Sequence, residues 1–296
     1  SPLPDAENVL TCGEIRKLIP KREEDSHKGS FGKALFVGGS ENMPGAVSIA
    51  AAGAVRSGVG LLTLFVPRVI RPEVAVLNPQ ATLKPADCDS EGRFSKAAAN
   101  LVPAEAERFD AVAVGCGMGV SRSTELLVRN LIRNYSGKLI LDADALNAIA
   151  DEPETLLDKR GEICITPHPG EMCRLTGLPV SEILADPAKT ALDFSKRFDV
   201  LVCLKSARTV TAFPEGRYFV NTTGGPSLSR GGSGDLLCGI MLSLAARMPL
   251  ESAAPAANHI HGLAADLAAE ALGENGADTM STANYIAPAM RKILRY

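Results

Sequence analysis

The sequence predicts an α/β fold in which a central, mainly parallel sheet is covered by helices on its faces. Short apolar runs alternate with Ala- and Leu-rich segments, and glycine-rich turns separate the two kinds of segment. Hydrophobic residues make up 46% and charged residues 22% of the 296 positions, which is ample for a sizeable core. We find no internal repeat and no low-complexity linker, so we expect one domain over residues 1–296.

The first strand–helix–strand unit lies near the N-terminus. Residues 33–37 are an apolar run that predicts a strand, and a glycine turn follows it. Pro44 suits the first turn of a helix over 46–57, and Gly58 is typical of a residue that ends a helix. Residues 61–66 predict a second buried strand. A strand, a helix and a strand in this order imply parallel strands with the helix packed on the sheet.

The same alternation continues to the C-terminus. The further strands that we expect cover 111–114, 138–141, 162–166 and 200–205, with a hairpin formed by 208–213 and 217–221. The further helices that we expect cover 121–134, 236–247, 251–271 and 282–295. Residues 83–96 and 273–281 read as surface loops. Residues 1–32 are polar and Pro-rich, so we expect them to lie outside the core, with 1–26 as an N-terminal arm and a short helix within 11–20.

Charge and aromatic content exclude two classes of partner. The net charge is −3, there is no tryptophan, and aromatic residues make up only 4% of the chain. A nucleic-acid or anionic-membrane partner would require a basic surface, so we expect neither. The most apolar stretch, 46–66, is interrupted by Arg56 and several glycines, which argues against a membrane span.

The cysteines and the first residues predict a cytoplasmic protein. Seven cysteines are scattered without a Cys-x-x-Cys pair, at positions 12, 88, 116, 164, 173, 203 and 238. An odd number of isolated cysteines, several inside apolar runs, is typical of free thiols in a reducing compartment. The initial Ser-Pro-Leu-Pro-Asp lacks the basic and apolar regions of a signal peptide. The Ala-rich helices favour a homo-oligomer, either a dimer or a tetramer.

The unusual polar clusters follow the ends of predicted strands. The residues concerned are Gly39, Gly117, Asp144, His168 and Lys205. Ligands bind outside the carboxyl ends of the strands in an open parallel sheet. We therefore expect one ligand site at this edge.

Residues 221–240 contain the feature that is most informative about function. The run Gly231-Gly232-Ser233-Gly234 ends on Asp235 and passes directly into an apolar helix. Glycine amides and the positive end of a helix form a site for an anion such as phosphate. The carboxylate of Asp235 beside that site would repel phosphate. It could instead act as a base that takes the proton from the hydroxyl group to which the phosphate is transferred. The alternative is a tight turn in which Asp235 serves only as a helix-start residue.

Three further clusters leave alternatives open. The glycines from Gly115 to Gly119 lack the spacing of a dinucleotide fingerprint, so they are a phosphate loop or a structural turn. His168, held between two prolines, could transfer a proton, bind substrate, or cap the following helix. His259 and His261 point to different faces of a helix and are expected to be packing or surface residues.

Two carboxylates and a lysine complete the chemistry. Asp142 and Asp144 end a strand and could hold Mg²⁺ through oxygen ligands, directly or through water. Lys205 ends another strand and could reach nucleotide phosphates as a point charge. One edge of the predicted sheet thus combines an anion-binding loop, a lysine, an acid and two carboxylates that could bind a metal ion. This combination indicates phosphoryl transfer that involves a nucleotide.

In their order along the chain, these motifs resemble the ADP-dependent (S)-NAD(P)H-hydrate dehydratases, ribokinase-like enzymes of nicotinamide nucleotide repair. The segment Thr166-Pro-His-Pro-Gly-Glu171 discriminates this family from sugar and vitamin kinases, which share Gly-x-Gly-Asp. The other motifs that carry the resemblance are His27-Lys-Gly-x-Phe-Gly32, Gly38-Gly-Ser40, the Gly115–Gly119 run, Asp142-Ala-Asp-Ala-Leu-Asn147 and Gly231-Gly-Ser-Gly-Asp235.

The resemblance implies a three-layer α/β/α fold and a repair reaction. The S epimers of hydrated NADH and NADPH (NADHX and NADPHX) would be dehydrated at the expense of ADP, possibly ATP, with Mg²⁺ as cofactor. The C6 hydroxyl would be phosphorylated and the phosphate eliminated, so that AMP and phosphate leave. The implied catalytic base is Asp235. The implied substrate contacts are Ala46, Gly117, Gly119, His168 and Asp235. The implied nucleotide contacts are Lys205, Ser206, Ala207, Arg208, Thr209, Gly231, Gly232, Ser233 and Gly234.

Two other functions stay open at this point. One is a kinase of the same fold that phosphorylates a vitamin precursor, and the other is a nucleotide-binding regulator without catalysis. The Thr166–Glu171 segment disfavours the kinase, and the presence of Asp235 disfavours the regulator. Many members of the family also carry an epimerase domain, for which these 296 residues leave no room.

Overall fold

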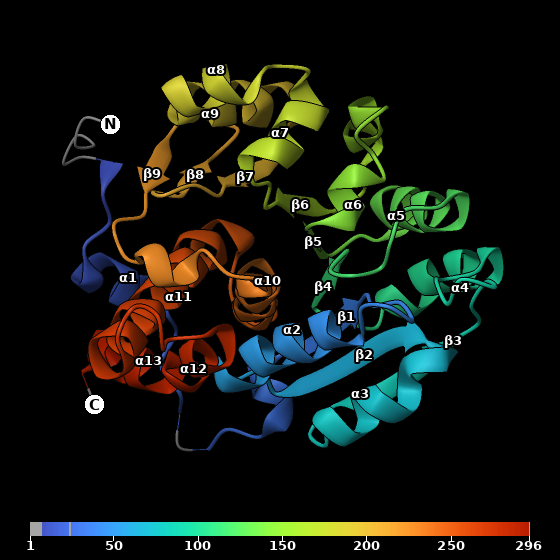
Figure 1. Cartoon of the computed structure of the whole chain (residues 1–296), viewed down its shortest axis with the longest axis horizontal. Coiled ribbons are helices and arrows are strands. Elements are labelled where there is room, and N and C mark those ends of the chain that lie inside the picture. Colours follow the sequence, from blue (N-terminus) through green and yellow to red (C-terminus); the bar gives the residue numbers. More distant parts are fainter. Residues whose placement is uncertain (1–7, 24, 296) are drawn as a thin grey trace.

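The computed structural model describes residues 8–23 and 25–295 (Figure 1). These residues form one nine-stranded sheet in the order β3-β2-β1-β4-β5-β6-β7-β8-β9. All pairings from β3 to β7 are parallel, whereas β8 and β9 are added antiparallel. The strands are β1 Lys33–Val37, β2 Leu61–Pro67, β3 Thr82–Ala86, β4 Ala111–Val114, β5 Lys138–Leu141, β6 Glu162–Ile165, β7 Leu201–Leu204, β8 Val210–Ala212 and β9 Tyr218–Val220.

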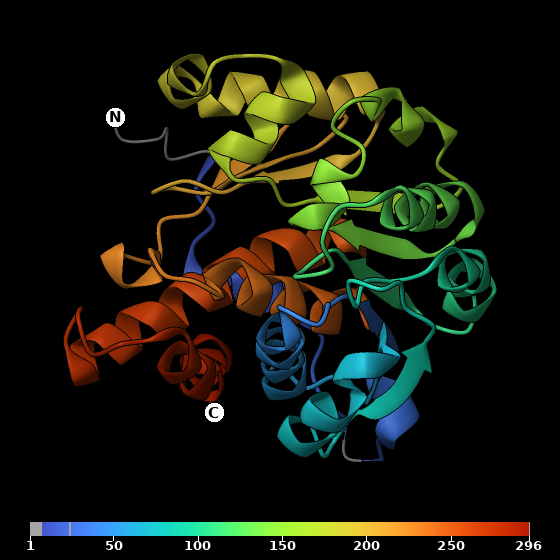
Figure 2. The same ribbon diagram turned by 45° about the vertical axis from the view of Figure 1, so that its right-hand side comes forward.

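Helices cover both faces of the sheet, which confirms the α/β architecture. In Figures 1 and 2 the orange and red helices lie with α2 on one side, and the green and yellow helices on the other. The first layer holds α1 Cys12–Leu18, α2 Pro44–Arg56, α3 Arg71–Leu77, α10 Ser233–Ala245, α11 Leu250–Leu272, α12 Thr279–Asn284 and α13 Ile286–Leu294. The second layer holds α4 Lys96–Ala106, α5 Arg122–Asn134, α6 Asp144–Asn147, α7 Pro169–Thr176, α8 Val180–Ala185 and α9 Pro187–Phe198.

Strand β1 shows how one strand serves both layers. Ala34 and Phe36 pack into the core beneath α2 and α10, whereas Leu35 and Val37 pack into the core beneath α4 and α5. Successive side chains of a strand point to opposite faces, so a strand buried on both sides is apolar throughout. In the part of the chain that the structure describes, no helix is long and apolar enough to cross a membrane.

Two expectations about the periphery are wrong. Residues 82–86 were expected to belong mainly to a surface loop, but they form β3, which pairs only with β2 at the edge of the sheet. An edge strand tolerates the lysine and proline that make this segment look irregular. The N-terminal residues were expected to stay outside the core, yet Ile15 and Ile19 of the α1 segment are buried in it.

Other differences concern helix boundaries. The helix expected over 282–295 is divided into α12 and α13, with Tyr285 between them. Helices α3, α4, α8 and α9 lie in segments to which the sequence assigned no helix. Proline occupies an early position in α3 and α9, where a helix tolerates it because no amide partner is lost there.

Glycines allow helices α2 and α10 to pack with their backbones in contact. A β-carbon at Gly53 would lie 2.4 Å from the backbone oxygen of Leu236, and one at Gly239 would lie 1.9 Å from that of Ala50. Real side chains do not approach carbonyl oxygens so closely, so both positions require glycine. The contact fixes the position of α10, whose first turn carries Asp235.

We predict that Gly239→Ala destabilises the protein although alanine favours helices. Relieving the overlap with Ala50 must displace one helix, which costs about 1–3 kcal/mol or more. Gly45→Ala is the matched control, because a β-carbon at Gly45 meets nothing within 4 Å. It should leave the free energy of unfolding unchanged or raise it by up to about 1 kcal/mol. Urea denaturation measures both variants, and equal stabilities would contradict the close contact.

Candidate active site

A cleft of about 790 Å³ lies at the carboxyl ends of β6 and β7. Its walls come from the loops that follow β6, β7 and β9 and from the facing parts of α10 and α11. The residues that line it include His168, the run Lys205-Ser206-Ala207-Arg208-Thr209, Ser233, Gly234, Asn258 and His261. This volume is in the range of small-molecule and cofactor sites.

The first turn of α10 forms one wall of the cleft. Gly232 has a φ of +84°, a left-handed conformation that glycine adopts without strain, and the helix begins at Ser233. Gly231 is held by its carbonyl oxygen, which accepts a hydrogen bond from the Thr279 hydroxyl at 2.8 Å. Amide donors and the positive end of the helix dipole are therefore presented beside Gly234, as an anion site requires.

Asp235, in the same turn, is a carboxyl group in an unfavourable place for charge. Burial, followed by the nearby charge of Asp142, raises its pKa to about 6. The neighbouring Cys116 thiol and the charge of Lys205 act in the opposite direction, and Asp144 raises the pKa further. A carboxyl with this pKa is matched to proton transfer near neutral pH.

Lys205 lies at the centre of a buried charge cluster. Its Nζ is 2.7 Å from Asp142 Oδ1 and 3.9 Å from Glu171 Oε2. Burial alone would lower the pKa of Lys205, but the two carboxylates outweigh it and raise the pKa, so the side chain is charged. Its Nζ also lies 3.4 Å from the position that a β-carbon of Gly234 would occupy. Lys205 is thus placed to serve both the carboxylates and an anion at the start of α10.

His168 caps helix α7, as one of the alternatives for this residue expected. Its Nδ1 accepts hydrogen bonds from the amides of Gly170 and Glu171 at 3.0 and 3.3 Å. Burial, then the charges of Lys205 and Arg174, lower the pKa of His168. A neutral ring that accepts at Nδ1 carries its proton on Nε2, which lies 3.4 Å from Glu171 Oε1. The ring is half exposed and lines the cleft, so capping does not exclude contact with a ligand.

The remaining predicted substrate residues form a second group. A β-carbon at Gly117 would lie 2.8 Å from that of Ala46, so these two positions are in contact. The amide of Gly119 donates to Asp144 Oδ2 at 2.9 Å. These residues do not line the cleft of 790 Å³. Asp235 interacts electrostatically with Asp142, which is paired with Lys205, and with Asp144, which binds the Gly119 amide.

Asp142 and Asp144 are poor direct ligands for Mg²⁺ in this arrangement. Asp142 Oδ1 accepts hydrogen bonds from Lys205 and from the Thr166 hydroxyl, both at 2.7 Å, and Oδ2 faces the Cys116 thiol. Asp144 is occupied by the Gly119 amide and by the Asn147 side chain. Mg²⁺ demands an octahedron of oxygens, so direct ligation by Asp142 does not fit, and contact through water molecules is the arrangement left to this pair.

The sequence reasoning missed His261 as a cleft residue. It is 6% exposed, and its Nε2 lies 3.4 Å from the Ser233 hydroxyl at the start of α10. Burial, with a contribution from Lys205, lowers its pKa to about 4, so the ring is neutral. Asn258 also lines the cleft. Asn258 and His261 are three residues apart in an otherwise Ala- and Leu-rich helix, so they lie on the same helix face. This polar pair is the sequence feature that could have identified them as cleft residues.

Comparison with known proteins decides the family. A family model described as NAD(P)H-hydrate dehydratase matches residues 34–288. The chain belongs to this family. The matched segment runs from β1 to α13, so it includes the cleft, α10 and the buried charge cluster.

Individual relatives support the assignment to the NAD(P)H-hydrate dehydratase family. The chain is 35% identical to the bifunctional NAD(P)H-hydrate repair enzyme of Moorella thermoacetica over 90% of its own length and 50% of that protein. It is 34% identical to the ADP-dependent (S)-NAD(P)H-hydrate dehydratase of Bacillus subtilis, over 86% and 87% of the two chains. The chain thus spans about half the length of the bifunctional relatives that it matches.

Solved structures agree with the family. A crystal structure of the ADP/ATP-dependent NAD(P)H-hydrate dehydratase of B. subtilis, co-crystallized with ATP and Mg²⁺, matches with a TM-score of 0.84 and 29% identity, over 96% and 98% of the chains. A ribokinase-like protein of Enterococcus faecalis, 23% identical with a TM-score of 0.82, covers both chains fully and shows the shared fold.

For this family member we predict that the His168 cap is worth about 1 kcal/mol of stability. His168→Ala removes the acceptor for two amides at the start of α7 and should lower the free energy of unfolding by that amount. His168→Asn is the matched control, because asparagine is itself a favoured capping residue and should restore most of the loss. Urea denaturation of the three proteins measures the difference. Equal losses in both variants would show that the imidazole contributes by packing and not as a cap.

Proposed function

We propose that this protein catalyses the ADP-dependent dehydration of the S epimers of NADHX and NADPHX, which yields NADH or NADPH, AMP and phosphate. The observation that carries the proposal is Asp235, a carboxyl whose pKa is raised to about 6, beside the first turn of α10. A base and an anion site so close together suit a hydroxyl group that attacks a phosphoryl group. The names of the relatives supply the substrate class.

In the proposed reaction the adenine nucleotide occupies the cleft of about 790 Å³. The loop from Lys205 to Thr209 would hold it on one side, and Gly231, Gly232, Ser233 and Gly234 would receive the transferring phosphoryl group. The positive charge of Lys205 would interact favourably with the phosphates as well as with Asp142. ADP is the proposed donor, and ATP is an alternative that the B. subtilis structure supports.

The hydrated dinucleotide would bind against Ala46, Gly117, Gly119 and His168, with its C6 hydroxyl at Asp235. Asp235 would take the hydroxyl proton while the oxygen bonds to the terminal phosphorus and AMP leaves. The phosphate ester then departs from C6, because the ring nitrogen donates its electron pair, and loss of the C5 proton restores the dihydropyridine. Hydroxide is a poor leaving group and phosphate is a good one, which explains the use of a nucleotide.

Mg²⁺ is proposed to arrive with the nucleotide. When bound, it would neutralise phosphate charge and orient the transferring group. Because Asp142 is occupied by Lys205 and Thr166, the chain would contact the ion through water molecules beside Asp142 and Asp144. The steps assigned to Asp235 and to the start of α10 do not depend on the ion's position.

We predict that wild-type protein supplied with NADHX, ADP and Mg²⁺ produces NADH, seen as the dihydropyridine absorbance. Asp235→Asn should lower turnover by about 10²–10⁴-fold, the usual contribution of a general base, and should leave ADP affinity within a few-fold. Asp193→Asn is the control, because Asp193 is an exposed residue of α9. Unchanged turnover of Asp235→Asn would remove this residue from the mechanism. Phosphorylation of a vitamin precursor with no NADH formed would identify a kinase instead.

The raised pKa of Asp235 predicts the pH dependence of the same assay. The base form is present above pH 6, so kcat/KM should be level near neutral pH and should fall about tenfold for each unit below pH 6. The charges that face Asp235 are Asp142 and Asp144, which raise its pKa, and Lys205, which lowers it. Initial rates between pH 4.5 and 8 in a constant-ionic-strength buffer would measure the midpoint. A midpoint near 4 would show that Asp235 is not the titrating base.

A further inference from the structure

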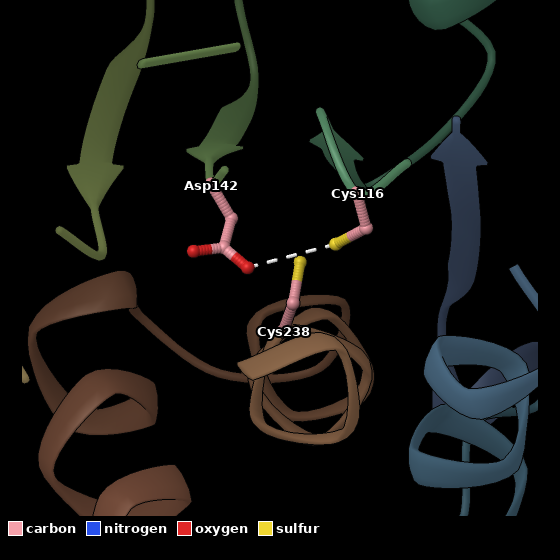
Figure 3. Close-up of side chains that lie close together, drawn as sticks. All are labelled: Cys116, Asp142 and Cys238. Atoms are coloured by element: carbon pink, nitrogen blue, oxygen red, sulfur yellow. Dashed lines mark hydrogen bonds between the residues drawn. The ribbon is translucent and has the colours of Figure 1, made fainter. Parts of the chain in front are cut away.

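Two thiols and a carboxylate converge immediately behind the start of α10. Cys116 follows β4, Asp142 follows β5, and Cys238 lies one turn after Asp235 in α10 (Figure 3). All three residues are buried, and their ligand atoms lie within 4.8 Å of one another. In Figure 3 both sulfur atoms point toward the Asp142 carboxylate, although the three residues come from three separate elements.

We propose that Cys116, Cys238 and Asp142 form a binding site for Zn²⁺, and that an ion bound there inhibits the enzyme. The inhibition, though not the binding, rests on the function proposed above. Asp235 lies one turn before Cys238 in α10 and interacts electrostatically with Asp142, so a bound ion would lie beside the proposed base. Water would complete the coordination of the ion.

The distances fit tetrahedral zinc. Zn–S bonds of about 2.3 Å and Zn–O bonds of about 2.1 Å place a sulfur and an oxygen ligand about 3.6 Å apart, and two sulfurs about 3.8 Å apart. Cys116 Sγ lies 3.6 Å from Asp142 Oδ2. The third donor, Cys238 Sγ, is within 4.8 Å of both atoms.

The ligand types favour zinc over magnesium. Sulfur donors select soft or borderline ions, whereas Mg²⁺ requires oxygen donors. When Zn²⁺ binds, both thiols lose their protons to solvent and become thiolates. The two thiolates and Asp142 then carry three negative charges, which Zn²⁺ and the neighbouring Lys205 balance. The three ligands, the ion and Lys205 together are then neutral, which limits the cost of burying the ion.

Gly234 and Lys205 connect the cleft with this buried cluster. Asp142 Oδ2 lies 3.9 Å, and Lys205 Nζ 3.4 Å, from the position that a β-carbon of Gly234 would occupy. Gly234 and Lys205 both line the cleft, and Asp235 is partly exposed. Because residue 234 is glycine, no side chain stands at that position beside the Asp142 carboxylate.

Occupancy would impair the proposed reaction because it weakens the base. A divalent cation beside Asp235 stabilises its carboxylate and so lowers its affinity for the C6 hydroxyl proton. Asp142 would also be drawn from Lys205 toward the metal. The inhibition therefore acts through Asp235 and Asp142, and the nucleotide loop from Lys205 to Thr209 stays free.

The binding test uses Co²⁺ as a spectroscopic probe for Zn²⁺. Protein kept reduced with a phosphine is titrated with Co²⁺, and thiolate-to-cobalt charge transfer should appear with one ion per chain and vanish when Zn²⁺ is added. Cys116→Ala/Cys238→Ala should abolish the band. The matched control is Cys164→Ala/Cys203→Ala, which removes another buried thiol pair, 3.8 Å apart, and should retain the band. Circular dichroism checks that both double variants are folded.

The inhibition test compares the activity of each protein with and without Zn²⁺. At a Zn²⁺ concentration about ten times its Kd, roughly nine-tenths of the sites are filled. NADH formation by the wild type and by the control pair should then fall about tenfold and recover after chelation and resupply of Mg²⁺. The Cys116→Ala/Cys238→Ala protein should show less than a twofold change.

The two tests separate the site from the proposed function. Absence of the cobalt band in the wild type, or its persistence in Cys116→Ala/Cys238→Ala, would overturn the metal site whatever the activity. A band that behaves as expected, in a protein that forms no NADH even without Zn²⁺, would support the site and overturn the repair function. A band with full activity in the presence of Zn²⁺ would overturn the inhibition.

Discussion

The ion pair between Lys205 and Asp142 is the interaction on which the candidate site depends. Three carboxyl groups, Asp142, Glu171 and Asp235, share the field of this single lysine. Asp142 lies closest to Lys205 and forms an ion pair with it, in which Oδ1 of Asp142 is 2.7 Å from Nζ of Lys205. Burial raises the pKa of Asp235 most, the charge of Asp142 raises it further, and Lys205 lowers it only in part. With Lys205 paired to Asp142, Asp235 is left as a carboxyl suited to proton transfer near neutral pH.

The position of that carboxyl is set by helix packing and not by the cleft itself. Helix α10 lies against α2 with glycine at both crossing points, Gly53 and Gly239, and its next turns are buried on every side. A helix fixed in this way presents its first turn at a constant height above the strand ends. Loops alone would leave the carboxyl and the amide donors free to separate. Precision at the site therefore originates in backbone contacts within about one turn of Asp235.

Much of this could be predicted from the sequence because strand ends in a parallel sheet must meet at one edge. The order of apolar runs placed Gly117, Asp144, His168 and Lys205 together without any structural information. Pairings between side chains could not be predicted in this way. The sequence marked Asp142 as a possible metal ligand, but it could not show that Lys205 and Thr166 bind its Oδ1. Such partners depend on the stagger of neighbouring strands, which composition does not reveal. Strand β3 was missed because its proline and lysine are compatible with a strand only at the edge of a sheet. Which strand lies at the edge depends on the strand order, which the sequence did not reveal.

The burial that tunes Asp235 also explains the proposed sensitivity to zinc. A carboxyl keeps its proton near neutral pH only if water is excluded around it, and in this chain the excluding groups include Cys116 and Cys238. Thiols are small and apolar enough to fill that space. They are also strong ligands for soft metals, unlike alanine or valine of similar size. The choice of sulfur in the packing behind Asp235 therefore couples the strength of the base to the availability of a thiophilic ion.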